Sequence, residues 1–199
     1  MTRQNILKVA AEEFSKYGYD AVSMNNLAAK LQVNKATIYY HFKDKKSLYQ
    51  EILTTLIKIN REQNEKIVNS DAQAKEKLKQ YIMLFIKTTK ENPQIVPISL
   101  REMANLGANI DNAISIELEH EMLYLKQIIL SLNLKDKYKD LDFYELKAML
   151  MGTINSYYSM QMSHIDFKGM KDFSRNSDDI LDSIGEFIVN IFIDALCKD

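Results

Sequence analysis

The chain has 199 residues, of which 46% are hydrophobic and 27% charged, a balance that excludes a disordered protein and fits a compact globular one. It contains only five glycines and two prolines, which disfavours an all-β fold with its many turns. The single cysteine, Cys197, excludes an intramolecular disulfide. No apolar run approaches the roughly 18 residues of a membrane span, and the first residues lack the apolar core of a signal peptide. We therefore expect a soluble, cytoplasmic protein.

The net charge of −1 says little about partners, but the distribution of charge along the chain is uneven. Residues 1–50 contain eight basic and four acidic side chains, whereas the remainder contains 18 basic and 23 acidic ones. A basic N-terminal quarter on an acidic body favours a local surface that binds a polyanion. A difference of four charges can also arise by chance.

Apolar residues that recur at spacings of three and four predict the first helices. One helix is expected over about residues 2–17, and Gly18 then supplies a left-handed C-terminal cap. A second, short helix begins after the N-cap Ser23 and ends near Leu31.

A third helix is expected over about residues 35–42, with Asn34 as its N-cap. Ile38 and Phe42, four residues apart, point into the core. Asp44 is a suitable cap for the next helix. Further helices are expected over about residues 44–59, 74–90, 97–106, 114–132, 142–164 and 178–198.

This pattern predicts an all-α protein of about nine helices, in which an N-terminal three-helix domain is fused to a C-terminal helical bundle. We place the boundary so that residues 1–46 form the first domain and residues 47–199 form the second.

The last two expected helices are apolar on more than one side, and a second apolar face needs a second partner. They also contain Gly152 and Gly185, where glycine costs ~1 kcal/mol relative to alanine unless a close backbone approach offsets it. We predict a homodimer built on a four-helix arrangement across a two-fold axis. The alternative is that these helices are buried centrally within one subunit. The predicted interface residues are Gly152, Ile184, Gly185, Ile188 and Phe192.

Residues 23–42 predict two short helices joined by a tight turn, the arrangement of a helix-turn-helix. The second helix of such a pair enters the DNA groove, so it must be short and carry hydrogen-bond donors on its free side. Many short helix pairs never touch DNA, so a helical small-molecule-binding protein with a purely structural helix pair stays open as an alternative function. The side chains available on the second helix are Lys35, Thr37, Tyr39, Tyr40 and His41.

The segment VSMNNLAAKLQVNKATIYYHFKDKKSLYQEIL resembles the DNA-binding segment of TetR-family transcriptional regulators. The resemblance spans roughly residues 3–55, and the remaining three quarters is similar only in length and helical character. Its features are Leu27-Ala28, Val33-Asn34, Ile38-Tyr39-Tyr40-His41-Phe42, Lys45 and Leu48, preceded by Phe14 and Tyr17-Gly18-Tyr19.

The resemblance implies contacts of the second helix and the following turn with DNA bases and phosphates. Two positions depart from the common family pattern: Gln32 stands where a turn glycine is usual, and Ala36 where a glycine often begins the recognition helix. Gln32 is therefore expected in a left-handed backbone conformation. Three implied contacts have structural alternatives, because Tyr39 can be a core aromatic, His41 a helix cap and Lys46 a solvated charge. The implied DNA-binding residues are Asn34, Lys35, Ala36, Thr37, Tyr39, Tyr40, His41, Lys45 and Lys46.

The resemblance also implies a small-molecule effector bound inside the C-terminal bundle, where the chain is rich in methionine. No buried cluster of charges is apparent from the sequence, so we expect an apolar or aromatic effector. An ordinary methionine-rich core is the alternative reading of the same residues. The candidate lining residues are Phe85, Met103, Met122, Tyr157 and Tyr158.

The sequence offers no positive support for an enzymatic function. Glu117 and His120 have the Glu-x-x-His spacing of di-iron bundles, but neither His41 nor His164 completes the second motif that such a site needs. No glycine-rich phosphate loop is present. We expect no catalytic residue, no metal and no cofactor. The predicted function is that of a ligand-responsive regulator, a repressor that binds a palindromic operator as a homodimer and is released by a small molecule.

Overall fold

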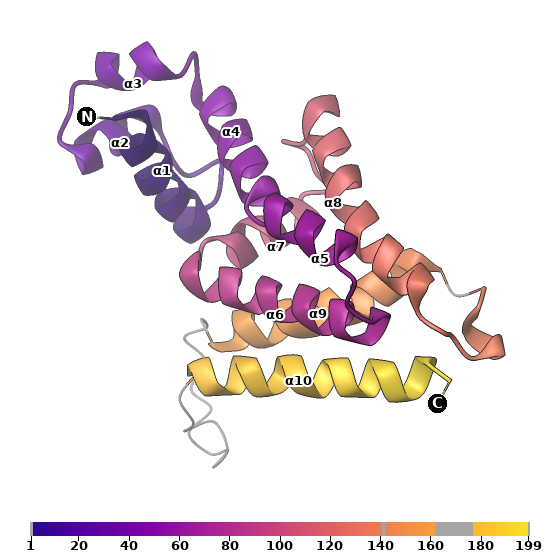
Figure 1. Ribbon diagram of the computed structural model, residues 1–199. Coiled ribbons are helices and arrows are strands. Elements are labelled where there is room, and N and C mark those ends of the chain that lie inside the picture. Colours follow the sequence, from indigo (N-terminus) through magenta and orange to yellow (C-terminus); the bar gives the residue numbers. More distant parts are fainter. Residues whose placement is uncertain (1, 141, 162–176, 199) are drawn as a thin grey trace. The chain divides into compact units, whose positions relative to one another are not determined.

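The computed structural model describes residues 2–140, 142–161 and 177–198, and it confirms the all-α fold (Figure 1). Within these residues, the regular elements are helices, apart from one isolated antiparallel bridge between Leu134 and Cys197. None of these helices is long and apolar enough to cross a membrane. The helices are α1 (Arg3–Tyr17), α2 (Met24–Leu31), α3 (Lys35–His41), α4 (Lys45–Lys58), α5 (Arg61–Asn69), α6 (Ala74–Glu91), α7 (Ile95–Ala104), α8 (Asn112–Ser131), the short 3-10 helix η1 (Asp136–Tyr138), α9 (Phe143–Gln161) and α10 (Ser177–Leu196).

The chain forms two compact units. The first unit combines Met1–Ile59 with Asn92–Glu119, and the second combines Asn60–Glu91 with His120–Asp199. Each unit therefore draws on segments that lie far apart in the sequence.

Local capping interactions define the helices at the start of the first unit. The side chains of Thr2 and Ser23 accept hydrogen bonds from backbone N–H groups in the first turns of α1 and α2. Gly18 caps α1 with φ +83°, and its N–H donates to the Phe14 carbonyl over 2.9 Å, but its ψ of 167° lies outside the left-handed helical region that was predicted. Asp44 accepts from the Ser47 N–H over 2.7 Å at the start of α4. These bonds satisfy backbone groups that a helix end leaves free.

The core of the first unit extends beyond its N-terminal helices. Phe14 of α1 meets the ring of Tyr49 of α4 edge-on, with centroids 4.9 Å apart. Ile98 of α7 and Ile114 of α8 belong to the same buried cluster. Arg101 adds a polar contact, because its guanidinium donates to the carbonyl of Lys16 near the end of α1 over 3.1 Å. The segment 92–119 is thus packed into the N-terminal helices rather than attached to them by a linker.

In the second unit, α10 packs along α6 and also contacts α9. Gly185 makes the approach of α10 to α6 possible, because a Cβ at this position would collide with the side chain of Ile86 and lie 3.0 Å from the sulfur of Met83. This contact explains why a glycine is tolerated inside the helix. Gly152 of α9 differs, since an added Cβ would have no neighbour within 4 Å.

Helix α5 is absent from the sequence prediction, which passes from a helix ending near residue 59 to one beginning near residue 74. Its nine residues are largely polar, so the apolar periodicity that marks other helices is missing. Its partner in α8 is the Glu121 carboxylate, which accepts hydrogen bonds from Arg61 over 3.0 Å and from the buried Asn64 over 3.3 Å. Contacts with residues distant in the sequence therefore stabilise this helix.

Candidate nucleic-acid interface

The turn between α2 and α3 is built on a left-handed residue. Gln32 has φ 55° and ψ 42°, as its place in the sequence predicted. Its N–H donates to the Ala29 carbonyl over 3.1 Å, and the N–H of Val33 donates to the Ala28 carbonyl over 3.0 Å. A left-handed conformation costs a residue other than glycine roughly 1–2 kcal/mol. The two hydrogen bonds of the turn stabilise this conformation, which sets the direction in which α3 leaves α2.

Helix α3 is held to the first unit by one face. Ile38 is fully buried and Phe42, which caps the helix, is nearly so. Asn34 begins the helix, and its Oδ1 accepts a hydrogen bond from the Ala36 N–H over 2.9 Å. The opposite face is therefore free to meet a ligand.

That opposite face of α3 carries cationic and hydroxyl-bearing side chains. Tyr40 is 85% exposed and Tyr39 is 43% exposed, while Lys35 is also exposed. The Lys35 ammonium lies 5.5 Å from the centre of the Tyr39 ring, close enough for a cation–π contact. The ring of His41 meets Tyr40 edge-on, with centroids 5.0 Å apart. Donors suited to bases and phosphates are thus grouped on one short helix.

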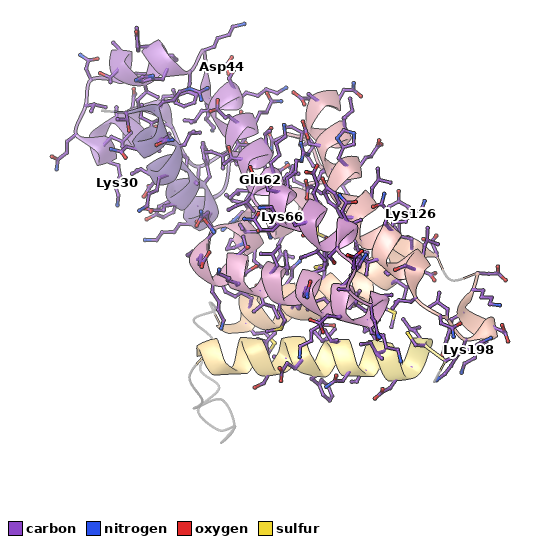
Figure 2. The ribbon with its side chains drawn as sticks, in the orientation of Figure 1. Lys30, Asp44, Glu62, Lys66, Lys126 and Lys198 are labelled. Carbon is purple, nitrogen blue, oxygen red and sulfur yellow. The ribbon has the colours of Figure 1, made fainter. Side chains whose placement is uncertain are left out.

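The start of α4 adds further positive charge beside this helix. Asp44, marked in Figure 2, lies at this helix start. Its carboxylate accepts hydrogen bonds from the backbone N–H and from the hydroxyl of Ser47. These bonds, the backbone one more strongly, hold the pKa of Asp44 below its ordinary value. The Lys45 ammonium lies 4.3 Å from the centre of the Tyr19 ring, and Lys46 is exposed. A helix N-terminus flanked by lysines attracts anions.

None of the nine residues implied by the resemblance is buried: Thr37, His41 and Lys45 are half-buried and the others are exposed. Lys43, which is not among the predicted residues, is also exposed in the turn that leads into α4. The sequence feature that could have added it to the predicted DNA contacts is its place in a run of lysines with Lys45 and Lys46. Arg3 of α1, by contrast, is engaged, because it pairs with Glu51 and its guanidinium lies 5.0 Å from the Phe42 ring centre.

The residues predicted for the effector site fall in both units. Met103 is exposed in the first unit, whereas the other four belong to the second, with Tyr158 buried and Phe85, Met122 and Tyr157 half-buried. None of the five lines the surface groove of about 270 Å³ between α5 and α8. That groove is lined by Arg61, Glu65, His120, Leu123, Tyr124 and Gln127.

The residues predicted for the dimer interface also differ in their surroundings. Gly185 and Ile188 are buried in the second unit, and Ile184 and Phe192 are half-buried. Gly152 is exposed.

Residues 6–52, which cover most of α1 to α4, match the sequence model of the family described as bacterial regulatory proteins, tetR family. Two relatives are similar in sequence. The uncharacterized HTH-type transcriptional regulator YhgD of Bacillus subtilis is 28% identical over 125 residues, 62% of this chain and 65% of that one. The biofilm operon icaADBC negative transcriptional regulator IcaR of Staphylococcus aureus is 37% identical over 49 residues, 25% of this chain and 26% of that one. The matched stretches therefore span less than two thirds of either relative.

A solved structure extends the similarity of fold to nearly the whole chain. The transcriptional regulator FadR of Bacillus subtilis, in complex with stearoyl-CoA, superposes with a TM-score of 0.62 at 18% identity and covers 94% of this chain and 98% of that one. At this identity the likeness concerns the fold alone.

Helix α3, anchored by its buried face and exposed on the other, follows a left-handed turn after α2, which is the arrangement of a helix-turn-helix. Residues 6–52, which contain this helix-turn-helix, are similar to the corresponding segment of bacterial regulatory proteins of the tetR family.

Proposed function

We propose that the protein is a transcriptional repressor that binds a palindromic operator as a homodimer and is released by a small-molecule effector. Residues 1–46 contact DNA, and residues 47–199 carry effector binding and dimerisation. The observation that carries this proposal is the division of α3 into a buried face around Ile38 and an exposed face bearing Lys35 and Tyr40. A repressor of this kind acts in the cytoplasm, where the chromosome of a bacterium lies.

On DNA, α3 enters the major groove with Lys35 and Thr37 toward the bases, where lysine pairs well with guanine acceptors. Tyr39, Tyr40 and His41 contact phosphates and sugars. Lys45, Lys46 and the additional Lys43 contact the backbone beside the N-terminus of α4. The Oδ1 of Asn34 caps α3, so this side chain would contact DNA through its Nδ2 amide group. Contacts to phosphate set affinity and register, while those to bases set sequence preference.

Dimerisation is supported by apolar side chains left uncovered on the last two helices. Phe187 and Ile191, four residues apart on α10, are 64% and 47% exposed. On α9, Met149 is exposed, and Gly152 has open space where a side chain would stand. Exposed apolar surface of this kind marks interaction sites, and a second copy of the chain is the partner that presents the same faces. Two recognition helices placed ~35 Å apart then meet successive turns of B-DNA.

Repression and release are supported by what the names of similar proteins state. IcaR is called a negative transcriptional regulator, and the FadR structure contains stearoyl-CoA. An effector that favours a dimer with wrongly spaced recognition helices releases the DNA. Converting a mostly competent population into a mostly incompetent one needs ~5 kcal/mol of differential affinity.

A gel-shift experiment with the DNA flanking the protein's own gene tests this function. The wild-type chain should bind a fragment with inverted half-sites more tightly than random DNA of equal length, while a Lys35→Ala, Thr37→Ala variant should lose this preference. Lys66→Ala, which removes an exposed charge from the second unit, is the matched control. If no double-stranded DNA is bound at low ionic strength, the alternative of a small-molecule-binding protein with a structural helix pair replaces this proposal.

A further inference from the structure

Lys147 lies on the buried face of α9. Buried side chains recur every four residues along this helix, at Leu146, Leu150, Ile154 and Tyr158. Lys147 precedes Leu150 by three residues and Ile154 by seven, so its side chain leaves the helix on the same side. The residue is half-buried, whereas Lys66 and Lys126, both marked in Figure 2, are exposed.

The charge of Lys147 meets no counter-charge within residues 2–140, 142–160 and 183–198. Burial lowers the pKa of its ammonium, and no charged group among the described residues offsets this shift. Within the described part of the chain, it also takes part in no ion pair or hydrogen bond. Withdrawing a cation from water without pairing it is costly, so such groups occur mainly where an anion joins them.

A second unsatisfied polar group lies on the same helix. The Oδ1 atom of Asn155 is buried and accepts no hydrogen bond from the residues that the structure describes. Asn155 follows Lys147 by eight residues, which corresponds to roughly 12 Å along a helix, with the half-buried Met151 midway between them. On α6, the buried hydroxyl oxygen of Thr89 also has no hydrogen-bond partner in the described part of the chain. Unpartnered polar groups inside a protein call for an explanation, and a missing ligand is one.

We propose that α9 binds the effector and that the effector is an amphiphilic anion, with an apolar or aromatic body and one acidic group. Lys147 pairs with the acidic group, Met151 contacts the apolar body, and the Asn155 carbonyl accepts a hydrogen bond from a donor on the ligand. This inference rests on the proposed function, because it names the chemical class of the effector. It sharpens the expectation of an apolar or aromatic effector by adding a negative charge.

The groove between α5 and α8 is a weaker place for the same anion. Its cation, Arg61, already pairs with Glu121 over 3.0 Å, and the Tyr124 hydroxyl donates to Glu65 over 3.1 Å. The carboxylates there would repel a second anion. Lys147 has no such neighbour among the described residues, which is why the site is assigned to α9.

Two fluorescent probes with the same ring skeleton test the inference on the purified full-length chain. Anilinonaphthalene sulfonate carries a sulfonate, and phenylnaphthylamine is its neutral counterpart. Replacing Lys147 by methionine should weaken sulfonate binding about tenfold, because a charge-assisted contact is lost, and leave binding of the neutral probe unchanged. Lys147→Arg should retain most of the sulfonate affinity. Lys126→Met, the matched control on an exposed position, should change neither probe.

Equal sulfonate affinity in the wild type and in Lys147→Met would overturn the inference, as would the absence of stoichiometric sulfonate binding. A lysine whose ammonium simply reaches solvent along its apolar stem would give the first of these results. Misfolding is a small risk, since removing an unpaired half-buried charge should leave the thermal midpoint unchanged or higher. A gel shift at saturating anilinonaphthalene sulfonate separates this inference from the proposed function. If sulfonate binding depends on Lys147 but DNA affinity is unchanged, the anion site is supported and release of DNA by an effector at this site is contradicted.

Discussion

The carboxylate of Glu102 on α7 accepts a 2.7 Å hydrogen bond from the hydroxyl of Tyr49 on α4, and both side chains are buried. The amide of Asn109 donates to the same carboxylate oxygen over 2.9 Å, while the second oxygen has no hydrogen-bond partner among the residues described. Helix α4 begins at Lys45, beside the proposed DNA contacts. This buried polar contact therefore joins the helix that follows the recognition helix to the segment 92–119.

Replacing Tyr49 by phenylalanine should destabilise the protein by about 1–3 kcal/mol, because a buried carboxylate loses one of its two donors. Urea unfolding followed by circular dichroism measures the change. Tyr40→Phe is the matched control, since its hydroxyl is on an exposed side chain and should contribute nothing measurable. If wild type and Tyr49→Phe have equal stabilities, the hydrogen bond between Tyr49 and Glu102 makes no net contribution to the free energy of unfolding.

The same pair should make stability sensitive to alkaline pH. Burial, followed by the hydrogen bond to Glu102, raises the pKa of Tyr49 well above its ordinary value. A raised tyrosine pKa contributes stability that is complete below the unfolded value of about 10 and is lost as the pH rises beyond it. The stability advantage of wild type over Tyr49→Phe should therefore shrink above about pH 10. Chemical unfolding at several pH values tests this, and a difference that grows with pH would contradict it.

The combined change Tyr40→Phe, Lys45→Ala should weaken binding to operator and to random DNA alike, because both side chains are proposed to contact phosphate. The dependence of affinity on salt should become shallower, by a slope of about one for the lost lysine contact. Fluorescence anisotropy at a series of salt concentrations measures both effects. An unchanged salt slope would remove Lys45 from the set of contacts.

Phe187→Glu should convert the proposed dimer into monomers in analytical ultracentrifugation, because a charge placed in an apolar interface is desolvated without a partner. Ile188→Glu is an instructive comparison: Ile188 is buried within the chain, so this change should lower the thermal midpoint of the fold itself. A dimer that persists in folded Phe187→Glu protein would move the interface away from this face of α10.

Gly185→Ala should destabilise the second unit by about 1–3 kcal/mol, because the new methyl group collides with Ile86 and crowds Met83. Gly152→Ala meets no atom of the same chain and should raise helix stability by up to ~1 kcal/mol. Thermal unfolding of the two variants compares them directly. An equal loss in both would indicate that Gly152 also packs closely, against a second copy.

The sequence by itself determined the helix-turn-helix, because the interactions that define it are short in range. The caps at Ser23, Asn34 and Asp44 each bond a backbone N–H two or three residues away, and Gly18 ends α1 through its own conformation. The left-handed turn at Gln32 was expected from the resemblance, because Gln32 stands where the family pattern has a glycine.

Only the tertiary structure decided the features that depend on residues far apart in the chain. Helix α5 lacks an apolar stripe and is stabilised by Glu121, about sixty residues onward. Gly185 fits against Ile86 across two helices, and the segment 92–119 joins the first unit through contacts such as that of Tyr49 with Glu102. Likewise, only the packing of the helices shows that Lys147 lacks a counter-charge among the described residues. Burial and pairing are properties of the folded surroundings, so a local pattern of residue types does not contain them.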